Sequence, residues 1–385
     1  MKMRSVGIIC EYNPFHNGHL YHLNKVKELY PNHVVILVMS SSFMQRGEAS
    51  ILNKWTKTKI ALEHGIDLII ELPYVFSSQS ADLFAKGSIQ LLNHLQVEVL
   101  VFGSETNDLT LLNKIANLSF SADYDQLTKK YLSEGYSYPK ALSNALKTIT
   151  GKDINTPNDI LAISYIKEIK RLKSKIKPIT IKRTSDYHSL ELKDDIVSAS
   201  SIRQALKDSL DIKKFVPNIT YNYLNHNLHF TEDYFPYLKY KILTEINNLH
   251  IYQTVDEGIE NRIKKYIIQS NSLDELIFNI KTKRYTYNKI RRMLTHILCN
   301  FTKEEASSFD DIEYIRILGF NDQGRKYLNS IKKELTIPLI TNYSKLNNKM
   351  LELEFRVTCV YSLVLKEKDK INLIESEFKN KPLIR

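Results

Sequence analysis

The sequence is short of cysteine, glycine and proline, and each shortage excludes a class of protein. The three cysteines among 385 residues, Cys10, Cys299 and Cys359, are too far apart for a zinc spacing or a disulfide framework. With 11 glycines and 10 prolines, the chain is neither collagen-like nor of low complexity. No run of eighteen apolar residues and no signal-peptide apolar region occur, so we expect no membrane association. These absences together predict a globular protein of the reducing cytoplasm.

The composition leaves room for two packed cores and a polyanionic partner. Hydrophobic residues make up 43% and charged residues 25% of the chain, and its length favours two domains. The formal net charge is +11, from 54 Lys and Arg against 43 Asp and Glu. The excess is spread over both halves of the sequence, so any basic patch must be assembled by folding.

The most informative stretch lies near the start. Residues 6–10 form a short apolar run of strand length, and Asn13-Pro14 is a turn signal that ends it. A helix is predicted from Asn17, which puts His16 and His19 where the strand passes into the helix. The free N–H groups at a helix start bind anions, most often phosphate, and two histidines add donors. The alternative is a pair of surface histidines beside an ordinary helix start.

The first two hundred residues alternate between strand-like and helix-like segments. Strands are predicted at 34–39, 67–72, 97–102 and 176–181, and helices at 53–63 and 81–93. This alternation predicts an α/β fold, a Rossmann-like domain with a parallel, doubly wound sheet. Ligands of such sheets bind beyond the carboxyl ends of the strands, where residues 40–46, 71–73 and 103–105 follow three of them.

Three further candidates lie later in this half. Asn158 stands in the first turn of a helix that begins at Pro157, where it can bond a base or ribose or simply cap the helix. Arg183 follows a strand and suits a phosphate, although an exposed ion pair is equally compatible with its position. A second anion-binding helix start is predicted from Ser198, Ser200, Ser201 and Arg203.

From about residue 211 the sequence turns helical and strand-like runs disappear. We therefore predict a catalytic domain at 1–210 and an all-helical domain at 211–385. Residues 281–292, here called the basic segment, contain six basic residues, two tyrosines and no acid. Charge and aromatic rings together suit RNA, and the alternative is a solvated basic helix face. The candidates for RNA binding are Lys281, Lys283, Arg284, Tyr285, Lys289, Arg291 and Arg292. Residues 320–325 are interpreted as a loop beside them.

Several of these motifs resemble known families. His16-Asn17-Gly18-His19 after a strand and a proline turn resembles the signature of the HIGH-type nucleotidyltransferase superfamily. Residues 197–203 are similar to its Ile-Ser-Ser-Thr-x-x-Arg element, with Ala199 and Ser201 as departures. Longer matches at 11–19, 43–48, 102–105 and 281–286 resemble the tRNA(Met) cytidine acetate ligase family over nearly the whole chain.

This resemblance implies a reaction. ATP and acetate would form acetyl-adenylate and pyrophosphate, and the acetyl group would pass to N4 of the wobble cytidine of elongator tRNA(Met). His16 and His19 would be catalytic, and Mg²⁺ would accompany the nucleotide without a metal site of the protein's own. The ATP site implied by the resemblance comprises Gly7, Ile8, Ile9, Cys10, Glu11, Tyr12, Asn13, Pro14, Phe15, His16, Asn17, Gly18, His19, Leu20, Gly103, Asn158 and Arg183, with Ser198, Ser200, Ser201 and Arg203 on the phosphates.

Two other functions remain open at this point. A small-molecule adenylyltransferase would share the first domain but leave the basic segment without a purpose. A non-catalytic RNA-binding protein would not need both His16 and His19. The oligomeric state and the selection of acetate over larger acids are not determined by the sequence.

Overall fold

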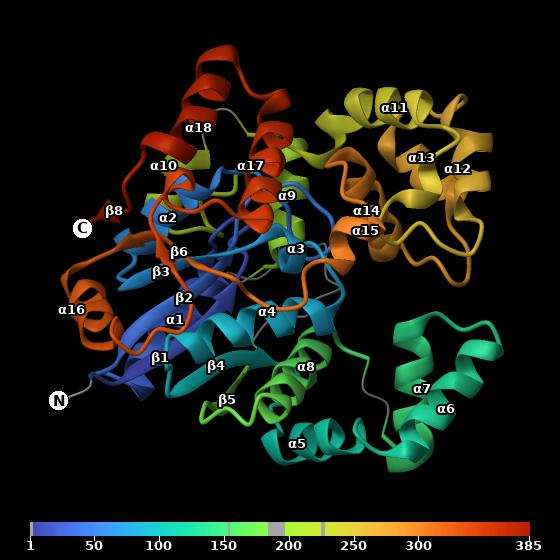
Figure 1. Ribbon diagram of the computed structural model, residues 1–385. Coiled ribbons are helices and arrows are strands. Elements are labelled where there is room, and N and C mark those ends of the chain that lie inside the picture. Colours follow the sequence, from blue (N-terminus) through green and yellow to red (C-terminus); the bar gives the residue numbers. More distant parts are fainter. Residues whose placement is uncertain (1–2, 153–154, 184–196, 225–227) are drawn as a thin grey trace.

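The computed structural model describes residues 3–152, 155–183, 197–224 and 228–385 (Figure 1). Its centre is a sheet in which the described strands follow the order β5-β4-β1-β2-β3-β6-β7, with β8 paired to β6. The strands are β1 (Ser5–Cys10), β2 (Val34–Ser40), β3 (Leu68–Leu72), β4 (Val99–Ser104), β5 (Lys177–Lys182), β6 (Ile315–Phe320), β7 (Leu339–Ile340) and β8 (Leu383–Ile384). The first five run parallel, which confirms the predicted α/β fold with a mostly parallel sheet.

The strand order explains where a ligand can enter. β1 lies between β2 and β4, so successive crossovers leave it in opposite directions and open a crevice at its carboxyl end. The connecting helices are α1 (Asn17–Leu29), α2 (Lys54–Glu63), α4 (Ala81–His94) and α8 (Pro157–Arg171). β2 is buried along its whole length, as expected for a strand covered on both faces.

The C-terminal region is largely helical but also returns to the sheet. β6 pairs antiparallel with β3, so the prediction that strands are absent after residue 211 is wrong. Arg316 interrupts the apolar run of β6, so the sequence pattern did not indicate a strand there. Its side chain is nevertheless fully buried between Glu71 and Glu377. Residues 320–325 are not a loop either, because α16 (Asp322–Ile331) begins there.

The buried apolar residues of the C-terminal half fall into two groups. Residues from Phe235 to Ile297 form a core of their own. Residues from Cys299 to Leu373 pack instead with the sheet. The helices are α10 (Asn218–Leu224), α11 (Phe235–Thr244), α12 (Ile259–Ile267), α13 (Leu273–Ile280), α14 (Tyr287–Leu298), α15 (Lys303–Ser307), α17 (Lys349–Tyr361) and α18 (Glu367–Lys379). The domain boundary at residue 210 stays a prediction.

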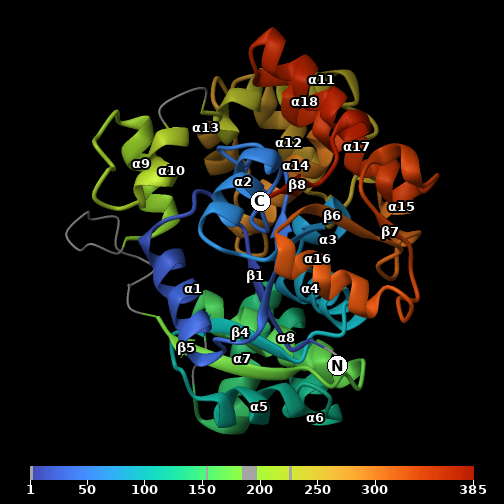
Figure 2. The same ribbon diagram turned by 90° about the vertical axis from the view of Figure 1, so that its left-hand side faces the viewer.

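A second helical group is inserted between β4 and α8. It comprises α5 (Leu109–Leu118), α6 (Ala122–Ser133) and α7 (Tyr138–Thr150). In Figures 1 and 2 the α11–α13 group lies in the upper part of the view and this group at the bottom. Across the described residues, no helix combines the length and apolar character that a membrane crossing requires.

Candidate active site

A cavity of about 920 Å³ opens at the carboxyl ends of β1 and β4. Its walls come from the β1–α1 loop, the starts of α8, α9 (Ala199–Lys207) and α14, the end of β5, and residues 45, 46 and 48 after β2. The sequence-predicted residues that line it are Ile9, Cys10, Glu11, Tyr12, Asn13, His16, Gly18, His19, Gly103, Asn158, Arg183, Ser198, Ser200, Arg203, Arg284, Lys289, Arg291 and Arg292. Folding therefore joins the predicted nucleotide residues and part of the basic segment in one space.

Other predicted residues stand behind the cavity rather than in its lining. They are Gly7, Ile8, Pro14, Phe15, Asn17, Leu20 and Ser201, together with Lys281, Lys283 and Tyr285 of the basic segment. Ile8 and Phe15 belong to the core, and a Cβ at Gly7 would meet Leu92 at 2.9 Å. Asn17 is held from the side, because its Nδ2 donates to the Lys214 carbonyl over 2.9 Å. Ile8, Phe15 and Asn17 therefore support the loop.

His16 and His19 form a capping box at the start of α1. The Gly18 N–H donates to Nδ1 of His16 over 3.0 Å, and the His16 N–H donates to Nδ1 of His19 over 3.4 Å. Because its Nδ1 accepts, the neutral His16 ring carries its proton on Nε2, and the His19 ring also donates to the Pro14 carbonyl. The ring centroids lie 3.9 Å apart. The backbone of this helix start thus fixes the tautomer of His16.

Both histidines are neutral at physiological pH. Burial, followed by the charges of Arg183 and Arg203, lowers the pKa of His16 to about 3. Burial and the neighbouring His16 ring lower the pKa of His19 well below its usual value. Two neighbouring imidazolium ions beside an arginine would repel one another in a medium that screens charge poorly. The pair therefore offers N–H groups without added charge.

Arg183 supplies the permanent charge. It follows β5, whose neighbour β4 ends beside it, and a Cβ at Gly103 would lie 3.2 Å from the Arg183 Cγ. The glycine leaves room for the arginine stem against the strand. The buried Nε of Arg183 has no hydrogen-bond partner among the described residues. An unpaired guanidinium nitrogen at the rim of a cavity suits an anionic ligand.

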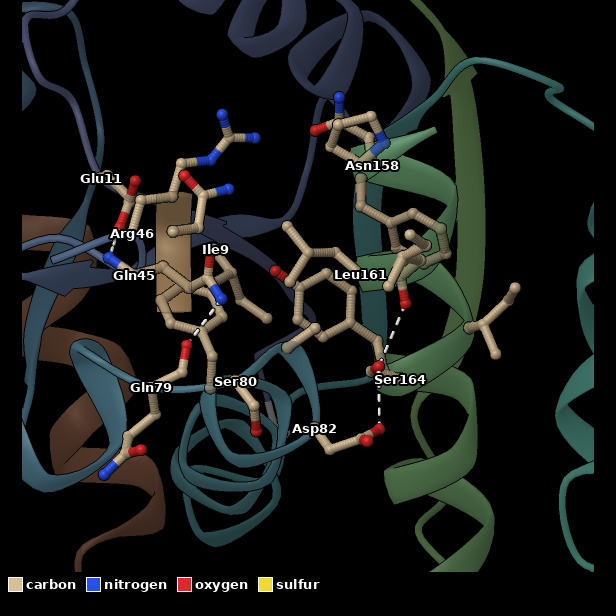
Figure 3. Close-up of a pocket in the computed structure, with 18 of the residues that line it drawn as sticks. Ile9, Glu11, Gln45, Arg46, Gln79, Ser80, Asp82, Asn158, Leu161 and Ser164 are labelled. Carbon is tan, nitrogen blue, oxygen red and sulfur yellow. Dashed lines mark hydrogen bonds between the residues drawn. The ribbon is translucent and has the colours of Figure 1, made fainter. Parts of the chain in front are cut away.

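The start of α8 is tied to the end of β4. Asn158 Nδ2 donates to the Glu105 carboxylate over 2.6 Å, and the Asp159 N–H donates to the same group over 3.1 Å. Asp159 in turn accepts from the Ser104 hydroxyl. The amide expected to meet a base or ribose is therefore already bonded to protein, although Asn158 does line the cavity (Figure 3).

α9 (Ala199–Lys207) provides the second helix start. Ser198 caps it by accepting from the Ser201 N–H over 3.1 Å, and Ser200 lies in the cavity lining. Arg203 reaches away from the serines and donates through Nη1 to the Asn13 carbonyl over 2.8 Å. It thereby holds the turn that precedes His16.

Glu48 is a site residue whose importance the sequence did not reveal. Its carboxylate bonds Arg203 of α9 on one side and Arg291 of α14 on the other, the latter at 2.9 Å. Burial alone would raise the pKa of Glu48, but Arg203, Arg291 and Arg46 together lower it. Its importance depends on partners more than 150 positions away in sequence, so spacing carries no signal of it.

Residues 45–48 also brace the β1–α1 loop. The Gln45 N–H donates to the Glu11 carboxylate over 2.5 Å, and the Gln45 side chain donates to the Gln79 carbonyl over 2.6 Å, as Figure 3 shows. Behind the loop, Lys57 donates to the carbonyls of Glu11 and Ser40. Burial lowers the pKa of Lys57 to about 7.

The basic segment is divided by folding. Tyr285 is buried, and its hydroxyl donates to the Asp256 carbonyl over 2.7 Å, so it has no free face for a base. Lys289 covers its ring at 3.7 Å. The prediction that Tyr285 contacts RNA is therefore not supported by its position. Lys283 lies outside the cavity, over the ring of Tyr136 at 4.4 Å.

Comparison with known proteins shows the family of this chain. The HIGH Nucleotidyl Transferase family model matches residues 3–375. A tRNA(Met) cytidine acetate ligase of Geobacillus sp. (strain WCH70) is 40% identical, with all of both chains covered. One of Caldicellulosiruptor saccharolyticus is 42% identical, covering 99% of this chain and 98% of the other.

Solved structures agree as well. The apo form of Thermotoga maritima TmcAL is 29% identical and superposes with a TM-score of 0.92, covering 99% of each chain. The form bound with alpha-thio ATP is 30% identical with a TM-score of 0.90 and the same coverage. The chain therefore belongs to the HIGH nucleotidyl transferase family and, within it, to the tRNA(Met) cytidine acetate ligases.

Proposed function

We propose that this chain activates acetate with ATP and transfers the acetyl group to N4 of the wobble cytidine of elongator tRNA(Met). The observation that carries the proposal is the shared cavity: the His16–His19 capping box and the arginines of α14 line the same space. One space can then form an adenylate and present it to an RNA base. The relatives' names and the ATP analogue in the neighbouring structure support the same reading.

In the first step an acetate oxygen attacks the α-phosphorus of ATP, and the bond to the bridging oxygen of the β-phosphate breaks. Charge develops on the departing pyrophosphate. The Nε2–H group of His16, the His19 ring and the Arg183 guanidinium are the donors that we propose for it. They are ordered before the ligand arrives, and preorganised donors of this kind stabilise a transition state most effectively.

In the second step N4 of cytosine attacks the acetyl carbon, AMP leaves and N4 releases a proton. An amine cannot displace an oxygen from free acetate at a useful rate, so the adenylate supplies the leaving group. The base lies in an unpaired loop of the tRNA and can enter without melting a duplex. A tRNA substrate is consistent with a cytoplasmic location.

Mg²⁺ is proposed to enter with ATP. Among the described residues, no group of three or more His, Cys, Asp or Glu side chains is placed to hold a metal ion. Mg²⁺ commonly keeps its waters and binds through substrate phosphates, where it neutralises part of their charge.

The test is acetate-dependent pyrophosphate release from ATP, with and without tRNA, followed by nucleoside mass analysis of that tRNA. The proposal expects release that requires acetate and a cytidine heavier by one acetyl group. Pyrophosphate release that is indifferent to acetate would indicate a small-molecule adenylyltransferase instead. If no pyrophosphate is released at all, RNA binding without catalysis would be the remaining function.

A further inference from the structure

The cavity has two walls of opposite character beyond the nucleotide residues. One wall is basic and comes from the basic segment, through Arg284, Lys289, Arg291 and Arg292. The other is apolar and aromatic and comes from α4, α6 and α7, through Leu83, Phe84, Tyr124, Tyr138, Leu142 and Leu146. We call this second set the aromatic wall. No sequence motif assigns a role to these residues.

Tyr138 is the member of the aromatic wall that can receive a ligand. It is the first residue of α7, and 49% of it is exposed, whereas Tyr124 is buried. Burial raises the pKa of both tyrosines, and the charge of Asp82 raises each further. Asp82 is fixed by Ser164, whose hydroxyl donates to it over 3.0 Å (Figure 3). Tyr138 therefore presents ring surface on a supported base.

The two walls approach each other outside the cavity. Lys283 of the basic segment lies over the ring of Tyr136, which immediately precedes α7, at 4.4 Å. In Figure 1 the α6–α7 pair lies directly below the α12–α14 group. The contact joins the basic segment to a residue two positions before Tyr138, so the two walls come from neighbouring elements, and the space between them is called the slot.

The charges in the slot indicate a polyanion. Nine lysines and arginines line the cavity: Arg46, Lys167, Lys182, Arg183, Arg203, Arg284, Lys289, Arg291 and Arg292. The carboxylates in the lining are Glu11, Glu48 and Asp82. A basic face opposite an aromatic face is the arrangement that binds single-stranded nucleic acid, with phosphates on one side and base rings on the other.

We propose that the aromatic wall is the base-stacking surface for an unpaired RNA loop, with Tyr138 as its platform and the basic segment holding the phosphates opposite. This inference deepens the proposed function and rests on it, because it names where the loop bases lie. The stacking ring thus comes from α7, not from Tyr285 in the basic segment itself.

The test compares affinities for a fluorescently labelled RNA hairpin with an unpaired loop. Stacking of a base on a ring contributes roughly 1–3 kcal/mol, so Tyr138→Ala should weaken binding by about 5- to 150-fold. Tyr138→Phe keeps the ring and should bind as the unaltered chain does. Tyr240→Ala is the matched control, because Tyr240 is 70% exposed on α11 and does not line the cavity.

Each outcome separates the hypotheses. If the unaltered chain does not bind the hairpin, the proposed function fails. If it binds and Tyr138→Ala binds equally well, only the stacking surface is refuted. Affinity for ATP is measured in the same variants, and an equal loss for ATP and RNA would assign the aromatic wall to the nucleotide instead. Circular dichroism confirms that each variant is folded.

Discussion

Two helix starts face the same cavity and solve the problem of binding anions in different ways. At the start of α1, His16 and His19 are buried, neutral and held by the backbone. At the start of α14, Arg291 is partly exposed and Lys289 is half-buried, and the segment around them is basic. The first site offers oriented hydrogen bonds and the second offers charge.

The difference follows from burial. An ionised group loses its hydration in the interior, and a histidine responds by giving up its proton. A guanidinium keeps its charge: burial lowers the pKa of Arg292 to about 10, which still leaves it charged at neutral pH. Neutral hydrogen-bond donors therefore suit the nucleotide reaction at the start of α1. Permanent charges suit a large polyanion bound at the start of α14.

Removing a neutral donor should have the largest effect. His19→Ala should lower acetate-dependent pyrophosphate exchange by about 10²- to 10³-fold, as losses of single preorganised donors do. The control is His250→Ala. His250 is exposed between α11 and α12, and its replacement should leave pyrophosphate exchange unchanged. Near-normal exchange by a folded His19→Ala protein would remove His19 from the mechanism.

Breaking the link between the two helix starts should have an intermediate effect. Glu48→Gln leaves Arg203 and Arg291 close together without a shared anion, and we expect a loss of roughly tenfold in acetyl transfer to tRNA. Glu232→Gln, which loses a similar ion pair with Lys207 on α9, should be almost silent. Equal transfer rates in the two variants would show that the link is dispensable.

Removing positive charge from the basic segment should alter the salt dependence of RNA binding more than it alters enzymatic activity. Replacing Arg284 and Lys289 by Ala should weaken RNA binding and reduce the slope of log K against log salt by about 1.4, since each phosphate contact to a single strand contributes about 0.7. Replacing the exposed Lys332 and Lys333 removes equal charge elsewhere. An identical change of slope in both double variants would point to net charge rather than to this site.

The smallest effect is expected from pH. Because the pKa of His16 lies near 3, adenylation should show no loss of activity centred on the ordinary histidine value near 6.5. Stability should nevertheless fall below pH 6. As the pH falls below 6.5, the unfolded chain binds a proton at His16 and the folded chain does not. The stabilisation that is present above pH 6.5 is therefore lost as the pH falls. Melting temperatures of the unaltered chain and His16→Gln across pH 4–8 check this, and parallel curves would contradict it.

Local sequence was enough for the sheet and the nucleotide loop. The strand at 6–10, the turn at Asn13-Pro14 and the histidines of the helix start are all within fifteen residues, and the neighbouring strands have the apolar runs of buried parallel strands. The C-terminal strand was missed, because Arg316 breaks the run and its partners Glu71 and Glu377 are distant in sequence.

Tertiary structure alone decided which groups face the ligand space. The role of Glu48 depends on its bonds to Arg203 and Arg291. The proposed role of Tyr138 depends on the basic segment, which lines the same cavity. It also decided that Tyr285 is core, although its composition and neighbours suited RNA. The sequence by itself indicated the two histidines at the crevice, because one strand–turn–helix unit carries both. The aromatic wall and the basic segment lie more than a hundred residues apart in the sequence, and no local sequence pattern indicates that they line one cavity.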